Sequence, residues 1–293
     1  MTEAELAAMG AQLRAAGLTP RALAAWAGTD RLSALPARLP KLREPSARPV
    51  TPAAAALGAY VAGAVTAAGE RPGYAVLPLG PSLLVCDHAD APASERRVAW
   101  PDDSSYHLAL ALPAGRRARW LDLGCGSGFA PLLRPELAAA IDAVDLNPRA
   151  VAWTWLGARL SGIAHIAAWE ADLAAAPAGP YELITCNAPI PGAPDVELWR
   201  RADAGLFGRL WTAALGRIAP AGWIIVHGAL AELEAAPAIG TRVVVAYTPE
   251  DAAEAFGVLW WRPDAADRAV VRRRVLDVAR PHVSAQDYLD SVA

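Results

Sequence analysis

Three glycines at alternate positions follow an apolar segment in the stretch LDLGCGSG, residues 121–128. Glycine tolerates the left-handed backbone of a sharp turn and lets a ligand approach the main chain closely. The spacing differs from the usual dinucleotide pattern, which has a longer gap before its last glycine. We therefore expect Gly124, Gly126 and Gly128 to form a ligand-binding turn behind Asp122. The alternative is a tight turn that binds nothing.

Two further acidic residues follow apolar segments. Asp145 lies in the sequence VDLNP, and a carboxylate at such a strand end can accept hydrogen bonds from both hydroxyls of a ribose. Alternatively it caps the helix that begins at Pro148, a role that Asn147 fills at least as well. Asp172 can accept a hydrogen bond from the exocyclic amine of adenine while Leu173 offers its backbone N–H; the alternative for Asp172 is a loop acid.

An asparagine follows the next apolar segment, in the sequence TCNAPIP of residues 185–191. The side-chain carbonyl of Asn187 and a neighbouring backbone carbonyl can accept the two hydrogens of an amino or amide nitrogen. This positioning directs the nitrogen lone pair toward an electrophile. The alternative is a proline-rich turn that satisfies its own backbone. Because the three earlier segments also end in ligand-type residues, we predict that Asn187 orients an acceptor nitrogen.

Seven apolar segments, most of them separated by helical ones, must position these side chains. Their near-continuous apolar character is typical of strands buried on both faces of a sheet. Strands are expected at 119–123, 141–145, 163–168, 181–186, 222–228, 242–247 and 256–261, with helices at 148–161 and 196–218. The sequence thus predicts an α/β fold with a doubly wound, mostly parallel, seven-stranded sheet.

The chain before this sheet has a different character. Helices are expected at 2–16, from Thr19-Pro20, and from Thr51-Pro52 to about Gly69, with an irregular, proline-rich segment at 32–50. Short apolar runs at 74–79 and 82–87 flank Gly80-Pro81 and predict a hairpin, to which 96–100 could add a strand. A helix is expected at 104–112. We assign residues 1–112 to a helical and β-hairpin module that recognises the substrate, and residues 113–293 to the second domain.

Composition and charge exclude several classes of protein. The 293 residues are 54% hydrophobic, with a formal net charge of -3 and a pI near 6.0. Nucleic acid is disfavoured as a partner, because proteins that bind its backbone usually carry a basic surplus. The three widely spaced cysteines predict neither disulfides nor a metal site. With no apolar run long enough for a bilayer and no signal peptide, we expect a soluble, cytoplasmic protein.

Residues 115–262 resemble the class I S-adenosylmethionine-dependent methyltransferases, on the strength of LDLGCGSG, Asp145, Asp172 and the NAPI sequence at 187–190. The resemblance implies S-adenosyl-L-methionine as cofactor, S-adenosyl-L-homocysteine as product, and no metal. Asp122 would bind near the cofactor's amino group, the glycines its methionine portion, Asp145 its ribose and Asp172 its adenine. The residues implied in cofactor binding are Asp122, Gly124, Cys125, Gly126, Gly128, Asp145, Leu146, Asn147, Asp172, Leu173 and Asn187.

Within that fold the chain is similar to the methyltransferase-small group, which includes the HemK-like glutamine methyltransferases and the rRNA guanine-N2 methyltransferases. Asn187 and Pro189 stand where this group carries its catalytic N-P-P-[YF] motif, but the middle proline is absent and Ile190 replaces the aromatic. An aromatic ring could instead come from Tyr106 or Trp100. The stretch PDDSS at 101–105 also differs from the HemK-like pattern. Candidate substrate residues are Asp103, Ser104, Tyr106, His107 and Ile190.

These departures favour methyl transfer to a nitrogen of a small molecule or peptide in a biosynthetic pathway. A protein glutamine, an rRNA base or an oxygen acceptor is the alternative, with His107 as a possible base for the last. A non-catalytic cofactor-binding protein would need a corrupted glycine turn, and a dehydrogenase would not need NAPI. Trp260-Trp261 is interpreted as sheet packing. The Arg272–Arg274 run is interpreted as a solvated helix face.

Overall fold

The computed structural model describes most of the chain from residue 74 onward and the first helix. The described residues are 1–16, 18, 74–87, 91–99, 101, 103–189, 197–198, 201, 203–234, 236–248, 254–263 and 270–275, with the backbone alone at 103 and 270–275. The helices expected from Thr19 and Thr51, the irregular segment 32–50, Trp100 and Ile190 lie outside them.

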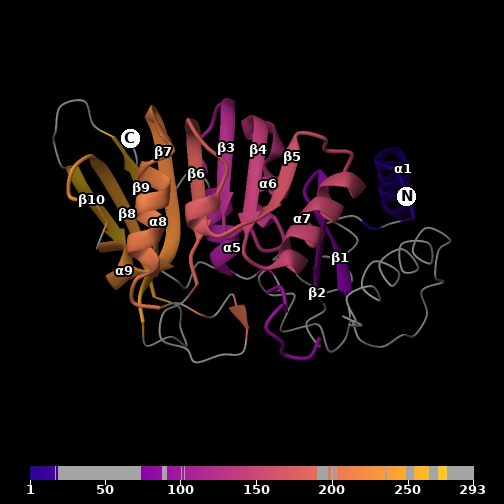
Figure 1. Cartoon of the computed structure of the whole chain (residues 1–293), viewed down its shortest axis with the longest axis horizontal. Helices are drawn as coiled ribbons and strands as arrows, with labels where there is room; N and C mark the ends of the chain where they lie inside the picture. Colours follow the sequence, from indigo (N-terminus) through magenta and orange to yellow (C-terminus); the bar gives the residue numbers. More distant parts are fainter. Residues whose placement is uncertain are drawn as a thin grey trace.

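A single large sheet forms the centre of the molecule (Figure 1). Its strand order is β10-β8-β9-β7-β6-β3-β4-β5, and all neighbours are parallel except β9, which is antiparallel to β7 and β8. The strands are β3 (Arg117–Leu123), β4 (Ala138–Asp145), β5 (Ile166–Glu170), β6 (Tyr181–Asn187), β7 (Ile218–Ala229), β8 (Thr241–Tyr247), β9 (Phe256–Arg262) and β10 (Val270–Val275). The expected doubly wound, seven-stranded sheet is confirmed, and β10 adds an eighth strand.

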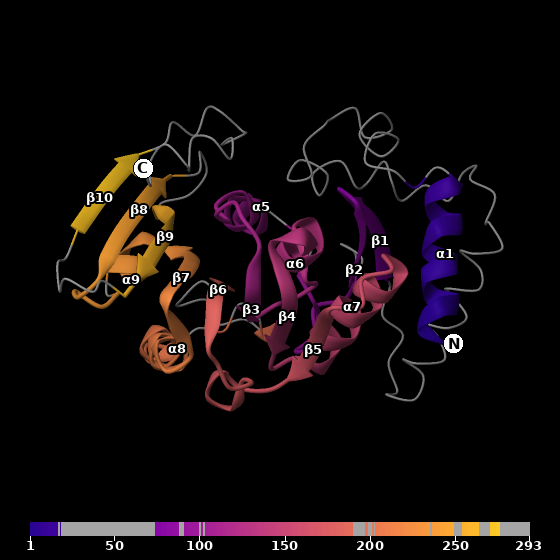
Figure 2. The same cartoon turned by 90° about the horizontal axis from the view of Figure 1, so that it is seen from above.

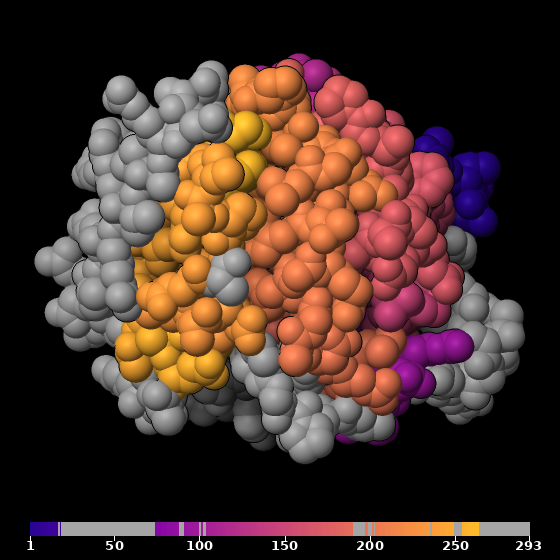
Figure 3. Space-filling model, turned by 60° about the vertical axis from the view of Figure 1, so that its left-hand side comes forward, coloured from indigo at the N-terminus to yellow at the C-terminus, as the bar shows by residue number. Residues whose placement is uncertain are grey.

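Helices cover both faces of this sheet, as Figure 2 shows. On one face lie α5 (Asp103–Leu110), α6 (Phe129–Leu133) and α7 (Pro148–Leu160); on the other lie α8 (Leu206–Leu215) and the short α9 (Leu230–Glu234). Figure 3 shows the side chains of this second face, in orange, as one continuous surface. Each face buries its own apolar cluster, so the near-continuous apolar strands are explained by burial on both sides.

Two of the expected element boundaries were wrong. The strand expected at 163–168 begins at Ile166 instead, because the helix before it ends in a cap in which Gly162 is left-handed and the Ile163 N–H donates to the Ala158 carbonyl. The helix expected at 196–218 is limited to Leu206–Leu215, within the residues described there. Asp203 accepts from the backbone N–H of Gly205 and sets up a turn before that helix.

Two other expected elements are also corrected. The segment 96–99 forms no strand, because the Val98 N–H donates to the Asp87 carboxylate rather than to a neighbouring strand. The Arg272–Arg274 run lies in strand β10 and not on a helix. Its backbone pairs in parallel with β8, whose open edge offers N–H and C=O groups, and β-branched valines at both ends of the segment favour the strand.

The N-terminal helix and the hairpin pack against α7. Helix α1 (Glu3–Ala15) begins with a capping box between Thr2 and Glu5. A Cβ at Gly10 would lie 1.8 Å from the Leu160 carbonyl oxygen, so only glycine permits this close approach of α1 to α7. Strands β1 (Tyr74–Leu79) and β2 (Ser82–Asp87) form the expected antiparallel hairpin. None of the helices in the described ranges has both the length and the apolar character needed to cross a membrane.

A buried carboxylate joins the hairpin to α7. Asp87, which is 1% exposed, accepts hydrogen bonds from Val98 N (2.9 Å), Arg149 Nη1 (3.1 Å) and Trp153 Nε1 (2.9 Å). We expect Asp87→Ala to lower the free energy of unfolding by about 3–5 kcal/mol, because it removes the acceptor shared by the half-buried Arg149 guanidinium and the Val98 and Trp153 N–H groups. Urea denaturation measures the change.

The control for this prediction is Glu95→Ala, which removes the surface ion pair between Glu95 and Arg201. Both side chains of that pair are exposed, so the urea midpoint should hardly move. Equal midpoints for wild type and Asp87→Ala would contradict the assigned role of Asp87.

Candidate functional site

The glycine stretch forms the expected sharp turn between β3 and α6. Gly124, Gly126 and Gly128 all have positive φ, at 68°, 54° and 74°. A Cβ at Gly128 would lie 2.8 Å from Thr154 Cγ2, so this glycine is needed for packing against α7. At Gly124 and Gly126 a Cβ would meet nothing within 4 Å. The first two glycines therefore border open space, where a ligand can approach the backbone.

Asp145 at the end of β4 holds this turn. One carboxylate oxygen accepts from the Gly126 N–H at 2.8 Å and the other from the Asn147 N–H, also at 2.8 Å. The Cys125 N–H donates to the Val144 carbonyl at 2.9 Å. Burial raises the pKa of Asp145, while the backbone donors oppose this rise. The Asp145 carboxylate thus fixes the position of the glycine turn, a contact that the sequence did not predict.

Three other residues predicted at the cofactor site, Asn147, Leu146 and Asp172, differ in burial and in hydrogen bonding. Asn147 is 5% exposed; it caps α7 by accepting from Arg149 N and donates to the Arg96 carbonyl. Leu146 is 57% exposed, an apolar side chain in solvent beside the acid. Asp172 is exposed and accepts from the Ala174 N–H, so in this structure it acts as a helix cap.

Asp122 is a buried acid beneath the glycine turn. It is 4% exposed and accepts a 2.5 Å hydrogen bond from the Thr185 hydroxyl on the neighbouring strand β6. Trp120 Nε1 in turn donates to Thr185 Oγ1 at 2.7 Å. Burial raises the pKa of Asp122 to about 7, against the hydrogen bond from Thr185, and the nearby charge of Asp145 raises it further. Asp122 therefore titrates near neutral pH, and a cation beside it would favour its charged form.

Asn187 at the end of β6 meets the start of α5, so the NAPI and PDDSS stretches are brought together. Its amide nitrogen donates to Ser104 Oγ at 2.8 Å and, more weakly, to Ser105 Oγ at 3.4 Å. Its carbonyl oxygen lies 2.9 Å from His227 Nδ1. Pro189, two residues further along the chain, is half-buried. Both ends of the Asn187 amide are thus held by side chains from other elements.

Aromatic rings gather on the β7–β9 side of Asn187. The His107 ring of α5 lies 4.3 Å from that of Tyr247, while the rings of His227 and Phe256 are stacked at 6.2 Å. Tyr106 packs against the apolar cluster on the α5 face. The rings described around Asn187 thus come from α5, β7, β8 and β9. Trp260 and Trp261 pack in the sheet, as expected.

Sequence reasoning missed His227 and Tyr247. Each lies at the carboxyl end of an apolar strand, the position that identified Asp145 and Asn187. His227 pairs directly with Asn187 in the register of β6 and β7. Polar residues at the ends of all the predicted strands, rather than of the first four, were the signal that could have revealed them.

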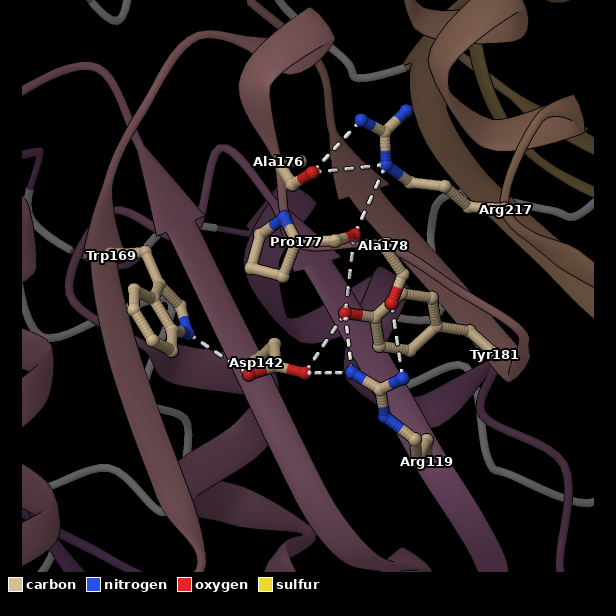
Figure 4. A network of polar contacts seen from close by, with 8 residues as sticks. All are labelled: Arg119, Asp142, Trp169, Ala176, Pro177, Ala178, Tyr181 and Arg217. Atoms are coloured by element: carbon tan, nitrogen blue, oxygen red, sulfur yellow. Dashed lines mark hydrogen bonds and ion pairs between the residues drawn. The ribbon is translucent and has the colours of Figure 1, made fainter.

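A second polar cluster lies on the opposite face of the sheet and does not touch this site. Figure 4 shows Asp142 between Trp169 on one side and Arg119 and Tyr181 on the other. Its carboxylate accepts from Trp169 Nε1, from the Tyr181 hydroxyl and from Arg119, each at 2.8–2.9 Å. The Arg217 guanidinium donates to the backbone carbonyls of Ala176 and Pro177, in the loop before β6. Three donors from β3, β5 and β6 meet on the Asp142 carboxylate, so we assign this cluster a role in holding neighbouring strands together.

The chain is similar to known methyltransferases over part of its length. Residues 94–263 match the family model described as a methyltransferase domain. The chain is 34% identical over 147 residues to a ubiquinone biosynthesis O-methyltransferase of Xanthomonas axonopodis pv. citri, covering 48% of this chain and 60% of that protein. It is also 34% identical over 118 residues to a ribosomal RNA small subunit methyltransferase C of Chromohalobacter salexigens, covering 40% and 33%.

Among solved structures, the chain is similar to N-methyltransferase NodS from Bradyrhizobium japonicum in complex with S-adenosyl-L-homocysteine. The TM-score is 0.42 at 19% identity, over 55% of this chain and 86% of that one. The chain spans 60% and 33% of the two curated relatives named above, less than two thirds of either.

Proposed function

Because the chain belongs to the class I S-adenosylmethionine-dependent methyltransferases, we propose that it transfers a methyl group from S-adenosyl-L-methionine to a nitrogen of a small molecule or peptide. The observation that carries this proposal is the convergence of strand ends. The glycine turn, Asp145 and Asn187 end the neighbouring strands β3, β4 and β6, so cofactor-binding and acceptor-orienting groups share one edge of the sheet.

The residues at this edge would suit the cofactor. At Gly124 and Gly126 a Cβ would meet nothing within 4 Å, so a ligand could approach the backbone there. Asp122 would pair with the amino group, Asp145 would accept from the ribose hydroxyls, and exposed Leu146 would cover the adenine. Asp172 and Leu173 would contact the edge of the adenine. When bound, the cofactor supplies a methyl group already activated by its positive sulfur.

Asn187 would orient the acceptor. Its carbonyl oxygen has two lone pairs, and His227 occupies one of them, which leaves the other for an N–H of the acceptor. A neutral amine needs alignment rather than a strong base, because its proton can leave after transfer.

Transfer to oxygen is the second candidate, and one observation favours it: the half-buried His107 lies beside Tyr247 at the same edge of the sheet. An oxygen acceptor would need such a base to remove its proton. A protein glutamine or an rRNA base remains a third possibility within the family.

A labelling assay tests the proposal. Purified protein is incubated with S-adenosylmethionine carrying a tritiated methyl group, together with protein, RNA or small-molecule fractions of a bacterial extract. Label in the small-molecule or peptide fraction is expected, on a nitrogen atom that NMR of the isolated product identifies. Label confined to RNA or to an oxygen atom would support the alternatives, and no label in any fraction would reject the enzymatic function.

Cofactor binding can be tested separately. S-adenosylhomocysteine should raise the melting temperature of the protein and NAD should not, because a ligand that binds the native state stabilises it. A shift with NAD alone would favour a dehydrogenase instead.

The affinity for S-adenosylhomocysteine is expected to rise with pH. Burial raises the pKa of Asp122 to about 7, and its charged form would pair with the cofactor's amino group. Below that pH, binding must first remove a proton, so Kd should rise by up to about tenfold per pH unit and level off above it. Calorimetric titration between about pH 5 and 8 measures the change. Asp122→Asn should weaken binding and abolish the slope; a flat wild-type profile would argue against this pairing.

We further propose that residues 1–112 select the acceptor, since Ser104 of α5 contacts Asn187. Helix α5 also contributes to the core: Leu108 is buried, and Trp260 Nε1 donates to the Ala111 carbonyl. A chain beginning at Pro113 would therefore expose the sheet. Ser104→Ala in the full chain is the better test, and it should raise KM for the acceptor while Kd for S-adenosylhomocysteine stays unchanged.

A further inference from the structure

His227 is a buried histidine that links Asn187 of β6 to Tyr247 of β8. It is 3% exposed and lies at the end of β7, next to β6 and β9. Its Nδ1 is 2.9 Å from the Asn187 carbonyl oxygen, and its Nε2 is 2.7 Å from the Tyr247 hydroxyl. Both ring nitrogens therefore have partners, and the ring is stacked against Phe256.

The direction of each hydrogen bond in this chain follows from the chemistry of the end groups. The amide nitrogen of Asn187 donates to Ser104, so it is the amide oxygen that faces His227. An amide oxygen carries no hydrogen and can only accept. His227 Nδ1 must then carry a proton and donate it. In the neutral ring Nε2 has no proton and accepts from the Tyr247 hydroxyl. The order of donation runs from Tyr247 to His227, to Asn187, and on to Ser104.

The surroundings keep His227 neutral. Burial lowers the pKa of His227 to about 3, and the positive charge that His107 can carry on α5 lowers it further. The groups that face it from β6, β8 and β9 are Asn187, Tyr247 and Phe256, none of which carries a negative charge. A buried ring with so weak a base strength is a poor proton acceptor for catalysis. What it does supply is a fixed N–H aimed at Asn187.

We propose that His227, held by Tyr247, is a positioning residue for methyl transfer that fixes the rotamer of Asn187 and leaves one lone pair of its carbonyl oxygen directed at the acceptor. This inference rests on the proposed function, because it assumes that Asn187 orients the acceptor nitrogen. It assigns to the β7–β8 side of the site a role that the glycine turn and Asp145 do not have: selecting the geometry of the acceptor rather than holding the cofactor.

Two amide substitutions test the proposal because each replaces one ring nitrogen. In His227→Asn the amide lies near the position of Nδ1 and can still donate to Asn187. In His227→Gln the amide lies near Nε2 and reaches Tyr247 instead. With tritiated S-adenosylmethionine and the extract fraction that takes up label, His227→Ala and His227→Gln should lower kcat by about tenfold or more. His227→Asn should recover most of that loss, while KM for S-adenosylmethionine stays unchanged in all three.

The matched control is His165→Ala. His165 is exposed, and its Nε2 lies 2.9 Å from the Pro135 carbonyl, before the start of β5 and away from the site. Its removal should leave kcat as in the wild type. If His227→Asn and His227→Gln are equally slow, or if all His227 variants turn over at the wild-type rate while methyl transfer persists, the inference is overturned and the proposed function is not.

A double-mutant cycle with Asn187→Ala separates positioning from a general structural role. If His227 acts through Asn187, adding His227→Ala to Asn187→Ala should slow turnover no further. Losses that multiply would overturn the inference. Tyr247→Phe is the milder variant should His227→Ala unfold, and a several-fold lower kcat is expected from it.

A spectroscopic measurement needs no acceptor. Nitrogen-15 NMR of the wild-type ring should show a neutral imidazole protonated at Nδ1, and Asn187→Ala should disturb that tautomer. A ring protonated at Nε2 in the wild type would contradict the proposed hydrogen-bond order.

Discussion

Replacing Asp145 with alanine is expected to raise Kd for S-adenosylhomocysteine by roughly a hundredfold to ten-thousandfold. The carboxylate would lose two charge-assisted hydrogen bonds to the ribose, each worth about 1.5–3 kcal/mol. It also holds the glycine turn through the Gly126 N–H, so the turn itself should loosen. Calorimetry or fluorescence titration measures the affinity.

The matched control is Asp142→Ala on the same strand. Asp142 points to the opposite face, where it accepts from Arg119, Trp169 and Tyr181 (Figure 4). Its loss should destabilise the fold but leave the affinity of the folded protein unchanged. An unchanged Kd for Asp145→Ala would remove Asp145 from the cofactor site. Equal weakening in both variants would point to a general structural effect.

Replacing Asn187 with alanine should slow turnover by roughly ten- to a hundredfold, the effect of losing a hydrogen bond of about 1.5–3 kcal/mol that forms mainly in the reacting complex. Kd for S-adenosylhomocysteine should change little, because Asp122 and Asp145 carry the predicted cofactor contacts. Measurement of kcat beside Kd separates the two effects.

Asn187→Asp is the more selective variant. It keeps the shape and still accepts hydrogen bonds, but it replaces the amide that donates to Ser104 and places a negative charge beside His227. The pKa of His227 should therefore rise. Near-normal turnover in Asn187→Ala would reject a nitrogen acceptor positioned by this residue and would favour an oxygen or carbon acceptor with His107 as its base.

Local sequence was sufficient for the fold class and for the glycine turn. Near-continuous apolar segments of strand length, most of them separated by helical segments, predict a sheet covered on both faces. Alternating glycines behind Asp122 predict a left-handed turn because no other residue adopts those φ values easily. The Asn147-Pro148 pair predicts the start of α7 for the same local reason, since capping depends on adjacent residues.

The surroundings of Asn187, the residue proposed to orient the acceptor, were decided by the tertiary structure alone. His227 reaches Asn187 through the register of β6 against β7, and Tyr247 reaches His227 across β9, whose antiparallel insertion no local pattern reveals. Strand β10 formed because β8 offered an open edge, although the arginine run suggested a helix. The rotamer of Asn187 depends on Ser104 and His227, which are 83 and 40 residues away in the chain. A hydrogen bond between segments so distant in the chain exists only once the sheet has brought them together.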